Sequence, residues 1–217
     1  MSSLEFAEIL NDLTLYAGFL PVVAAMVFWK FQKNEMKVFA INQIIWVLIF
    51  LFSIYLQKHN VKNHFVNYLH DLRIVLFVFL MYWIYDKNPL NRRILVALGF
   101  VVFSFVLVQW LFFQQNEWSG YTDTIVTLSV IFVSGFYLKK IINSYNQSLF
   151  KIPFWWIVTT ILITFFVNLF SNYFSKSALE YSTEVFLLIW NIISIIAIIS
   201  KVLFAYGFYI SKKYHLP

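Results

Sequence analysis

The chain has 217 residues, of which 61 % are hydrophobic and only 12 % are charged, and its formal net charge is +6. A soluble domain is about half apolar and about a quarter charged, so this composition excludes an ordinary soluble domain and favours a protein that dissolves in lipid. The sequence contains no cysteine, which excludes disulfides, thiol nucleophiles and cysteine-ligated metals.

The first apolar run is expected to be a retained helix, because a cleavable signal begins with positive charge and no Lys or Arg precedes Lys30. A membrane-spanning helix needs about 20 largely apolar residues. Since lipid offers no partner to open backbone groups, each run of that length should be helical. Seven runs qualify: Leu13–Phe31, Val38–Leu56, Val66–Tyr85, Ile94–Phe113, Thr122–Ile142, Phe154–Phe174 and Val185–Ile210. The sequence therefore predicts an all-α integral membrane protein, a seven-transmembrane-helix bundle that forms one membrane domain over residues 1–217.

Basic residues between the runs predict the orientation. Eleven Lys and Arg residues follow the first, third, fifth and seventh helices, whereas three border the opposite ends. Because the positive side of a membrane protein stays in the cytoplasm, the N-terminus should lie outside and the C-terminus in the cytoplasm. We expect a bacterial inner (cytoplasmic) membrane. Basic residues placed in this way give no reason to expect a nucleic-acid partner.

Polar residues inside the predicted helices are the main functional signal, because they are costly in lipid and usually face the bundle interior. With the predicted orientation, most of them fall in the outer half, while Asn42 and Lys201 fall in the cytoplasmic half. We therefore expect a polar cleft that opens to the extracytoplasmic side. Its candidate ligand-binding residues are His70, Asp71, Arg73, Asp123, Asn168, Asn172, Trp190 and Asn191.

The His70–Asp71–Arg73 cluster is the strongest part of this candidate pocket. Asp71 is turned about 160° from Arg73 around the helix, so it needs a partner on another helix. Arg73 suits a small anionic ligand, because a guanidinium matches the geometry of a carboxylate. Two other interpretations stay open: Arg73 can extend to the headgroups beside Asp71, and the Thr, Ser and Asn stripes can be contacts between helices.

Lys201 in the seventh helix raises the question of retinal, which binds lysine as a Schiff base. Ala197 stands where microbial rhodopsins carry an Asp, and no acid within the helices lies near Lys201. Retinal is therefore disfavoured, and we expect no cofactor. The histidines do not share a helix face, so no metal site is expected. No hydrolase or phosphate-loop motif is present, so we expect no enzyme, although an intramembrane hydrolase using Asp71 and His70 stays as a fourth alternative.

Several segments of the second half resemble a group of bacterial seven-helix membrane proteins of similar length. They are Pro153-Phe154-Trp155-Trp156, Asn168 to Ser171-Asn172, Trp190-Asn191 and Tyr206-Gly207. Members of that group often carry an acid early in the third helix, and Asp71 with Arg73 is the counterpart here. The resemblance covers the last third of the chain and the helix layout, and it implies a fold without a particular activity.

The sequence thus favours a small-ligand sensor or receptor-like module. Only seven residues follow Ile210, so a signal would pass to a separate membrane or cytoplasmic protein partner. The first alternative is a small-solute transporter or channel, which would need a polar path through both leaflets. The second is an accessory subunit of a membrane complex. In each case the lipid bilayer is the surrounding partner.

Overall fold

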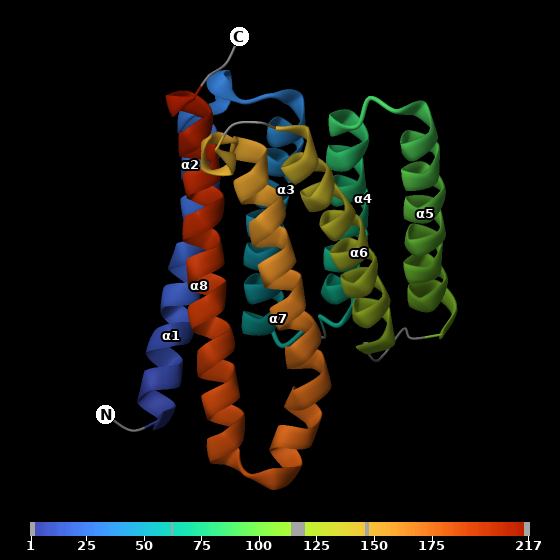
Figure 1. Cartoon of the computed structure of the whole chain (residues 1–217). Coiled ribbons are helices and arrows are strands. Elements are labelled where there is room, and N and C mark those ends of the chain that lie inside the picture. The colour runs from blue at the N-terminus through green and yellow to red at the C-terminus, as the bar shows by residue number, and fades with distance from the viewer. Residues whose placement is uncertain (1–2, 62, 114–119, 146–147, 215–217) are drawn as a thin grey trace. The chain divides into compact units, whose positions relative to one another are not determined.

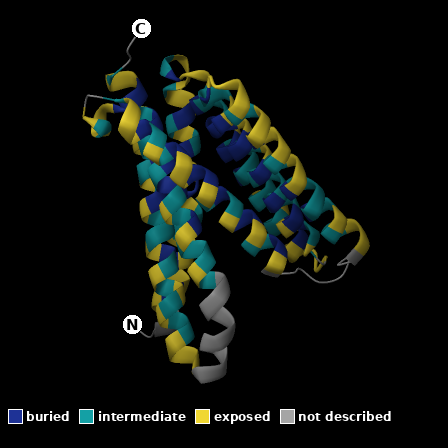
Figure 2. Cartoon of the chain, turned by 45° about the vertical axis from the view of Figure 1, so that its right-hand side comes forward, coloured by how far each residue is buried: buried dark blue, intermediate teal, exposed yellow. Residues whose placement is uncertain are grey.

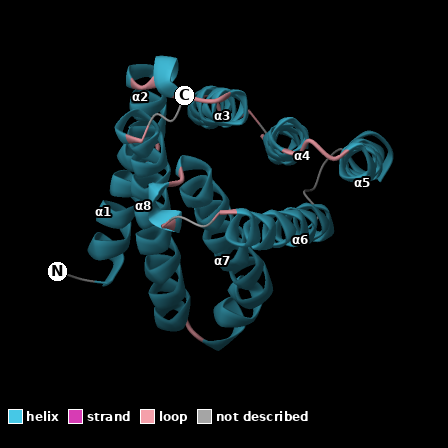
Figure 3. Ribbon diagram, turned by 45° about the horizontal axis from the view of Figure 1, so that its top comes forward, coloured by secondary structure: helices cyan, strands magenta, loops and turns pink. Residues whose placement is uncertain are grey.

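The computed structural model describes residues 3–61, 63–113, 120–145 and 148–214, apart from the side chains of residues 3–4, 113, 120 and 172–181. Within these ranges the regular elements are helices joined by short loops (Figures 1 and 3). Over these described ranges, seven helical segments are long and apolar enough to cross a membrane, the first of them interrupted by a break. The prediction of a helical multi-pass membrane protein is confirmed at this level.

Contacts between residues divide the chain into two compact units. Unit 1 comprises Met1–Phe31 and Ile131–Pro217, and unit 2 comprises Gln32–Val130. The helix α6 (Gly120–Ser144) contributes its first part to unit 2 and its second part to unit 1. The single membrane domain expected from the sequence stays a prediction.

The first span of unit 1 is two helices, α1 (Ser3–Ala17) and α2 (Phe19–Val27), followed by a 3-10 turn, η1 (Trp29–Phe31). Proline has no N–H, so Pro21 cannot bond the carbonyl of Ala17, four residues earlier, and the helix breaks at Gly18. The span also begins earlier than the expected Leu13, because Glu5 and Glu8 lie within α1. Acidic side chains near a helix N-terminus are stabilised by the helix dipole, which explains why they extend the helix.

The rest of unit 1 is built around two long helices, α7 (Pro153–Tyr181) and α8 (Thr183–Lys213). They lie side by side as a hairpin, and α1 and α2 pack against α8 (Figure 1). Ser182 caps α8, because its hydroxyl accepts a hydrogen bond from the backbone N–H of Val185 at 3.2 Å. A short 3-10 turn, η3 (Leu149–Lys151), leads into α7.

Gly207 sets the distance between α7 and α8. A Cβ atom at this position would lie 3.0 Å from Cδ1 of Ile157 and 3.3 Å from Cβ of Trp156. Small residues let helices approach closely in membranes, where packing is the main force that holds them together. Trp156 adds an edge-on contact with the ring of Tyr206, with centroids 4.9 Å apart.

Unit 2 contains α3 (Asn34–Lys58), α4 (Phe65–Tyr85) and α5 (Pro89–Val108), which continues as a π-helical turn, η2 (Gln109–Phe113). The helix α4 packs against both α3 and α5. It is also the most buried of the spans in the described residues, since 56 % of the residues in an 18-residue apolar stretch of α4 are buried. Figure 2 shows buried and exposed residues mixed along the helices. The core of unit 2 therefore lies around α4.

A tightly bonded turn joins α4 to α5. The Asp86 carboxylate is fully buried and accepts hydrogen bonds from the backbone N–H of Asn88 and from Nδ2 of Asn91, both at 2.8 Å. The Nε of Arg92 donates to the carbonyl oxygens of Trp83, at 3.0 Å, and of Asp86. These bonds fix both the turn and the guanidinium of Arg92.

Asn88 caps α5, and its loss gives the first testable expectation. Its side-chain oxygen accepts from the backbone N–H of Leu90 at 2.9 Å and of Asn91 at 3.5 Å. We expect Asn88→Ala to lower the free energy of unfolding by about 1 kcal/mol, because these donors lose their partner. Unfolding in mixed micelles with a denaturing detergent measures it. Asn88→Asp keeps the acceptor and should stay near the parent; an equal loss in both variants would contradict the capping role.

Candidate functional site

The predicted site residues of unit 2 come from α4 and α6. An antiparallel register between α3 and α4 sets the position of the α4 residues. Nδ2 of Asn63 donates to Oγ of Ser53 at 3.1 Å, and the rings of Phe52 and Phe65 lie 6.3 Å apart. Following the same register down the two helices places Arg73 opposite Asn42.

Arg73 and Asn42 form the central contact of the site. Nη1 of Arg73 donates to the side-chain oxygen of Asn42 at 2.5 Å and lies 3.3 Å from its backbone oxygen. Both residues lie eight positions from the starts of their helices, which is about 12 Å along the axis. The guanidinium is therefore held against α3, eight residues from the start of each helix.

The contact brings Asn42 and Arg73 together, although the sequence placed them in opposite halves of the membrane; that placement stays a prediction. The helix α3 begins at Asn34, before the expected Val38, and continues to Lys58. This longer helix puts Asn42 nearer its centre. A small anionic ligand was the partner expected for Arg73; the structure adds Asn42, an uncharged partner on α3.

Asp71 has its predicted neighbour on another helix. Its carboxyl is only 3 % exposed and lies within electrostatic range of the Asp123 carboxyl on α6 and of the Arg73 guanidinium. The neighbour is thus a second acid, and the cluster holds two carboxyl groups for one guanidinium. Ionisable groups inside an apolar span are costly and usually mark a functional position, so this cluster is the candidate site.

Several buried polar atoms of unit 2 have no hydrogen-bond partner among the residues that the structure describes. In α4 they are Oδ2 of Asp71 and Nε of Arg73. In α6 they are the hydroxyl oxygens of Thr122 and Thr127, both fully buried, and in α3 the side-chain oxygen of Gln43. An unpartnered buried polar group costs about 1–3 kcal/mol, so a bound molecule that supplied the partners would gain that energy.

The other predicted residues lie elsewhere. His70 precedes Asp71 on α4 and is half-buried. Asn168 on α7 and Trp190 and Asn191 on α8 belong to unit 1, and the side-chain oxygen of Asn191 is a buried acceptor without a described partner.

Trp190 is 41 % exposed and lines a groove of about 340 Å³ with Ala7, Glu8, Asn11, Phe186 and Leu187. The side chain of Asn172 lies outside the described residues. Lys201 is half-buried on α8.

Gln43, Thr122 and the Asp86 turn were not among the predicted site residues. Gln43 follows Asn42, so two adjacent amides stand in an apolar run. Thr122 was taken as the end of a span, although it is fully buried within α6. The pattern of Asp86, Asn88, Pro89 and Asn91 is typical of a capped turn before a helix and could have identified the Asp86 turn.

Comparisons of this chain with protein-family models, with curated proteins and with solved structures give no match. The arrangement in unit 2 therefore has to be interpreted from its own chemistry. It presents acceptors on the carboxyl groups, a donor on Arg73 and two threonine hydroxyls that can serve as either.

Proposed function

We propose that the chain is a multi-pass membrane protein that binds a small ligand in the Arg73 cluster, defined as Asn42, Asp71, Arg73, Asp123 and Thr127. The ligand would make it a sensor or receptor-like module. One observation supports the proposal. Oδ2 of Asp71 is a buried acceptor and Nε of Arg73 is a buried donor, and neither atom has a hydrogen-bond partner among the described residues. Empty functional sites leave such groups unpaired, whereas structural networks satisfy them.

The chemistry of the cluster defines the ligand class. A carboxylate or another planar anion would accept from Nε of Arg73, where a guanidinium presents a fork of donors. A donor on the same ligand, an ammonium or a hydroxyl, would satisfy the Asp71 and Asp123 side. We therefore propose a small carboxylate-bearing molecule that also carries a donor group, with Thr127 available to either end.

Native mass spectrometry of the gently solubilised protein tests this function. We expect a small adduct on the parent protein that is lost in Arg73→Gln, because the neutral amide cannot hold the anion. Lys139→Gln is the matched control, since Lys139 is exposed on α6 outside the Arg73 cluster and should keep the adduct. An adduct equal in both variants would place the ligand elsewhere. A parent protein that carries only a stoichiometric protein partner would favour the accessory-subunit alternative.

We propose the orientation given by the basic residues, with the N-terminus outside the cytoplasmic membrane of a bacterial cell. The cysteine-free sequence makes the test direct. A cysteine placed at His59, after α3, should react with a membrane-impermeant maleimide in intact cells. A cysteine at Lys33, before α3, should react only after permeabilisation. The reverse pattern would invert the topology, because the two positions flank one span.

A transporter is the second candidate, and the depth of the cluster favours it. Substrate sites of transporters lie near the bilayer midplane, and buried carboxyl groups carry protons in many of them. Asn42 and Arg73 meet eight residues from the starts of their helices, and Asp71 is a buried carboxyl with the half-buried Asp123 near it. Counterflow in proteoliposomes separates the two functions: uptake of labelled substrate that is lost in Asp71→Asn supports transport, and binding without uptake supports a receptor.

A further inference from the structure

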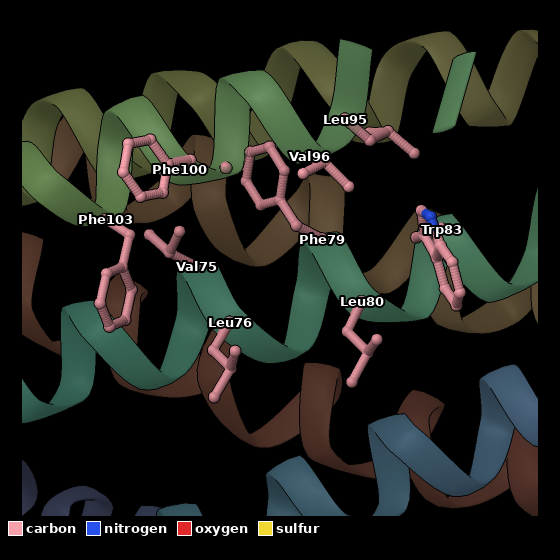
Figure 4. Close-up of a pocket in the computed structure, with 10 residues that line it drawn as sticks. Val75, Leu76, Phe79, Leu80, Trp83, Leu95, Val96, Phe100 and Phe103 are labelled. Carbon is pink, nitrogen blue, oxygen red and sulfur yellow. The ribbon is translucent and has the colours of Figure 1, made fainter. Parts of the chain in front are cut away.

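An apolar groove on unit 2 lies between α4 and α5 and plays no part in the Arg73 cluster. Figure 4 shows the side chains that line it. The groove has a volume of about 380 Å³. From α4 it is lined by Val75, Leu76, Phe79, Leu80 and Trp83, and from α5 by Leu95, Val96, Gly99, Phe100 and Phe103. Its outer lining is accessible, since Val96 is 59 % exposed and Phe100 is 70 % exposed.

Gly99 keeps the floor of the groove open. A Cβ atom at this position would lie 3.1 Å from the ring of Phe79, so a larger residue would push into the space. The groove follows α4 from Val75 to Trp83, eight residues or about 12 Å along the axis. It therefore forms an apolar channel parallel to the spans, a shape that suits a linear hydrocarbon chain.

The groove ends at two arginines. A second hollow of about 440 Å³ shares Trp83, Val96 and Phe100 with it and is also lined by Arg92 and Arg93. Both arginines lie in the first turns of α5, and Trp83 lies near the end of α4, so this end is at the membrane interface. Tryptophan and arginine are the residues expected at headgroup level.

The guanidinium of Arg92 is held in position for an anion. Nε of Arg92 donates hydrogen bonds to the carbonyl oxygens of Trp83 and Asp86, and Cζ of Arg92 lies 4.7 Å from the ring centroid of Trp83. Fixing Nε reduces the conformational entropy that Arg92 would lose on binding. The nearby Asp86 carboxylate is itself bonded by Asn88 and Asn91. Arg93 is exposed, so the end of the groove presents two positive charges.

We propose that this groove binds one anionic phospholipid of the surrounding bilayer, with an acyl chain along α4 and α5 and the phosphate on Arg92 and Arg93. The arginines would bind the charged headgroup, and the apolar lining would bind the acyl chain of the same molecule. Guanidinium groups bind phosphate through paired hydrogen bonds, and clusters of basic residues beside a span attract anionic headgroups. The proposal does not depend on the function of the Arg73 cluster.

Lipid titrations followed by native mass spectrometry test the headgroup contact. The full-length protein in neutral detergent is titrated with phosphatidylglycerol and with phosphatidylcholine of the same acyl chains. We expect phosphatidylglycerol to bind more tightly. The double variant Arg92→Gln/Arg93→Gln should lose at least about fivefold in affinity for it and a smaller factor for phosphatidylcholine, whose choline ammonium offsets the phosphate charge. Lys139→Gln, an exposed basic residue of unit 1, is the control and should bind like the parent.

A second variant tests the groove itself. Val96→Phe fills the groove and should lower the affinity for both lipids by a similar factor. Leu48→Phe is the matched control on α3, because Leu48 is also 59 % exposed and lies outside the groove. Equal affinity of the parent for both lipids would overturn the proposal, as would unchanged binding in Val96→Phe. A protein dimer that Val96→Phe dissociates would also overturn it, because the groove would then hold a second chain.

Discussion

Arg73→Ala is expected to lower the free energy of unfolding by about 3 kcal/mol. The substitution removes the donor to Asn42 and leaves the buried Asp71 carboxyl beside the half-buried Asp123 carboxyl without the guanidinium that offsets them. Removal of one partner from a buried charged network costs far more than loss of an exposed charge. Unfolding with a denaturing detergent in mixed micelles measures the change.

A double-mutant cycle with Asn42→Ala makes this expectation specific. The two substitutions should couple by about 1–2 kcal/mol, because the residues share one hydrogen-bonded contact. Arg93→Ala removes an equal charge from an exposed site and should stay within about 0.5 kcal/mol of the parent. A loss in Arg73→Ala no greater than in Arg93→Ala would show that the cluster does not hold unit 2 together.

Gly207→Leu is expected to lower the free energy of unfolding by about 2–3 kcal/mol, because the new side chain enters the contact between α7 and α8. Its Cβ alone would lie 3.0 Å from Ile157, and three further carbon atoms have no space on that side. The helices would have to separate and lose the contact of Trp156 with Tyr206. The quenching or shift of tryptophan fluorescence and the unfolding titration both report this change.

Gly135 provides the matched control for Gly207. It lies in α6, and a Cβ added there meets no atom within 4 Å. Gly135→Leu should therefore fold with a stability within about 1 kcal/mol of the parent, since only helix propensity changes. Ile157→Ala in the Gly207→Leu background should restore part of the lost stability. If both glycine variants behaved alike, close packing at Gly207 would not account for the effect.

The spans could be predicted from the sequence because length and apolar composition determine them directly. The run from residue 66 to 85 differs from α4 by one residue, since charged or polar residues bound it on both sides. The first span was predicted to start at Leu13, whereas it starts near Glu5. An apolar run does not locate the end of a helix that continues into polar residues. The helices α7 and α8 also continue beyond their apolar runs in this way.

The candidate site could be predicted only in part. Ionisable residues inside apolar runs identified Asp71, Arg73 and Asp123, because their cost in lipid makes them visible in any sequence. Their partners depend on the register between helices, which the sequence of one helix does not contain. Asn42 was recognised as a polar position, but its contact with Arg73 follows from the pairing of α3 with α4.

The length of α8 limits the bilayers that suit this protein. Its 31 residues extend about 46 Å, whereas the hydrocarbon core of a bilayer is about 30 Å thick. The apolar part, from Val185 to Ile210, is about 39 Å long and would need a tilt of about 40° to fit, the upper end of the usual range. Hydrophobic mismatch should therefore make the protein less stable in bilayers of short-chain lipids and favour thicker membranes.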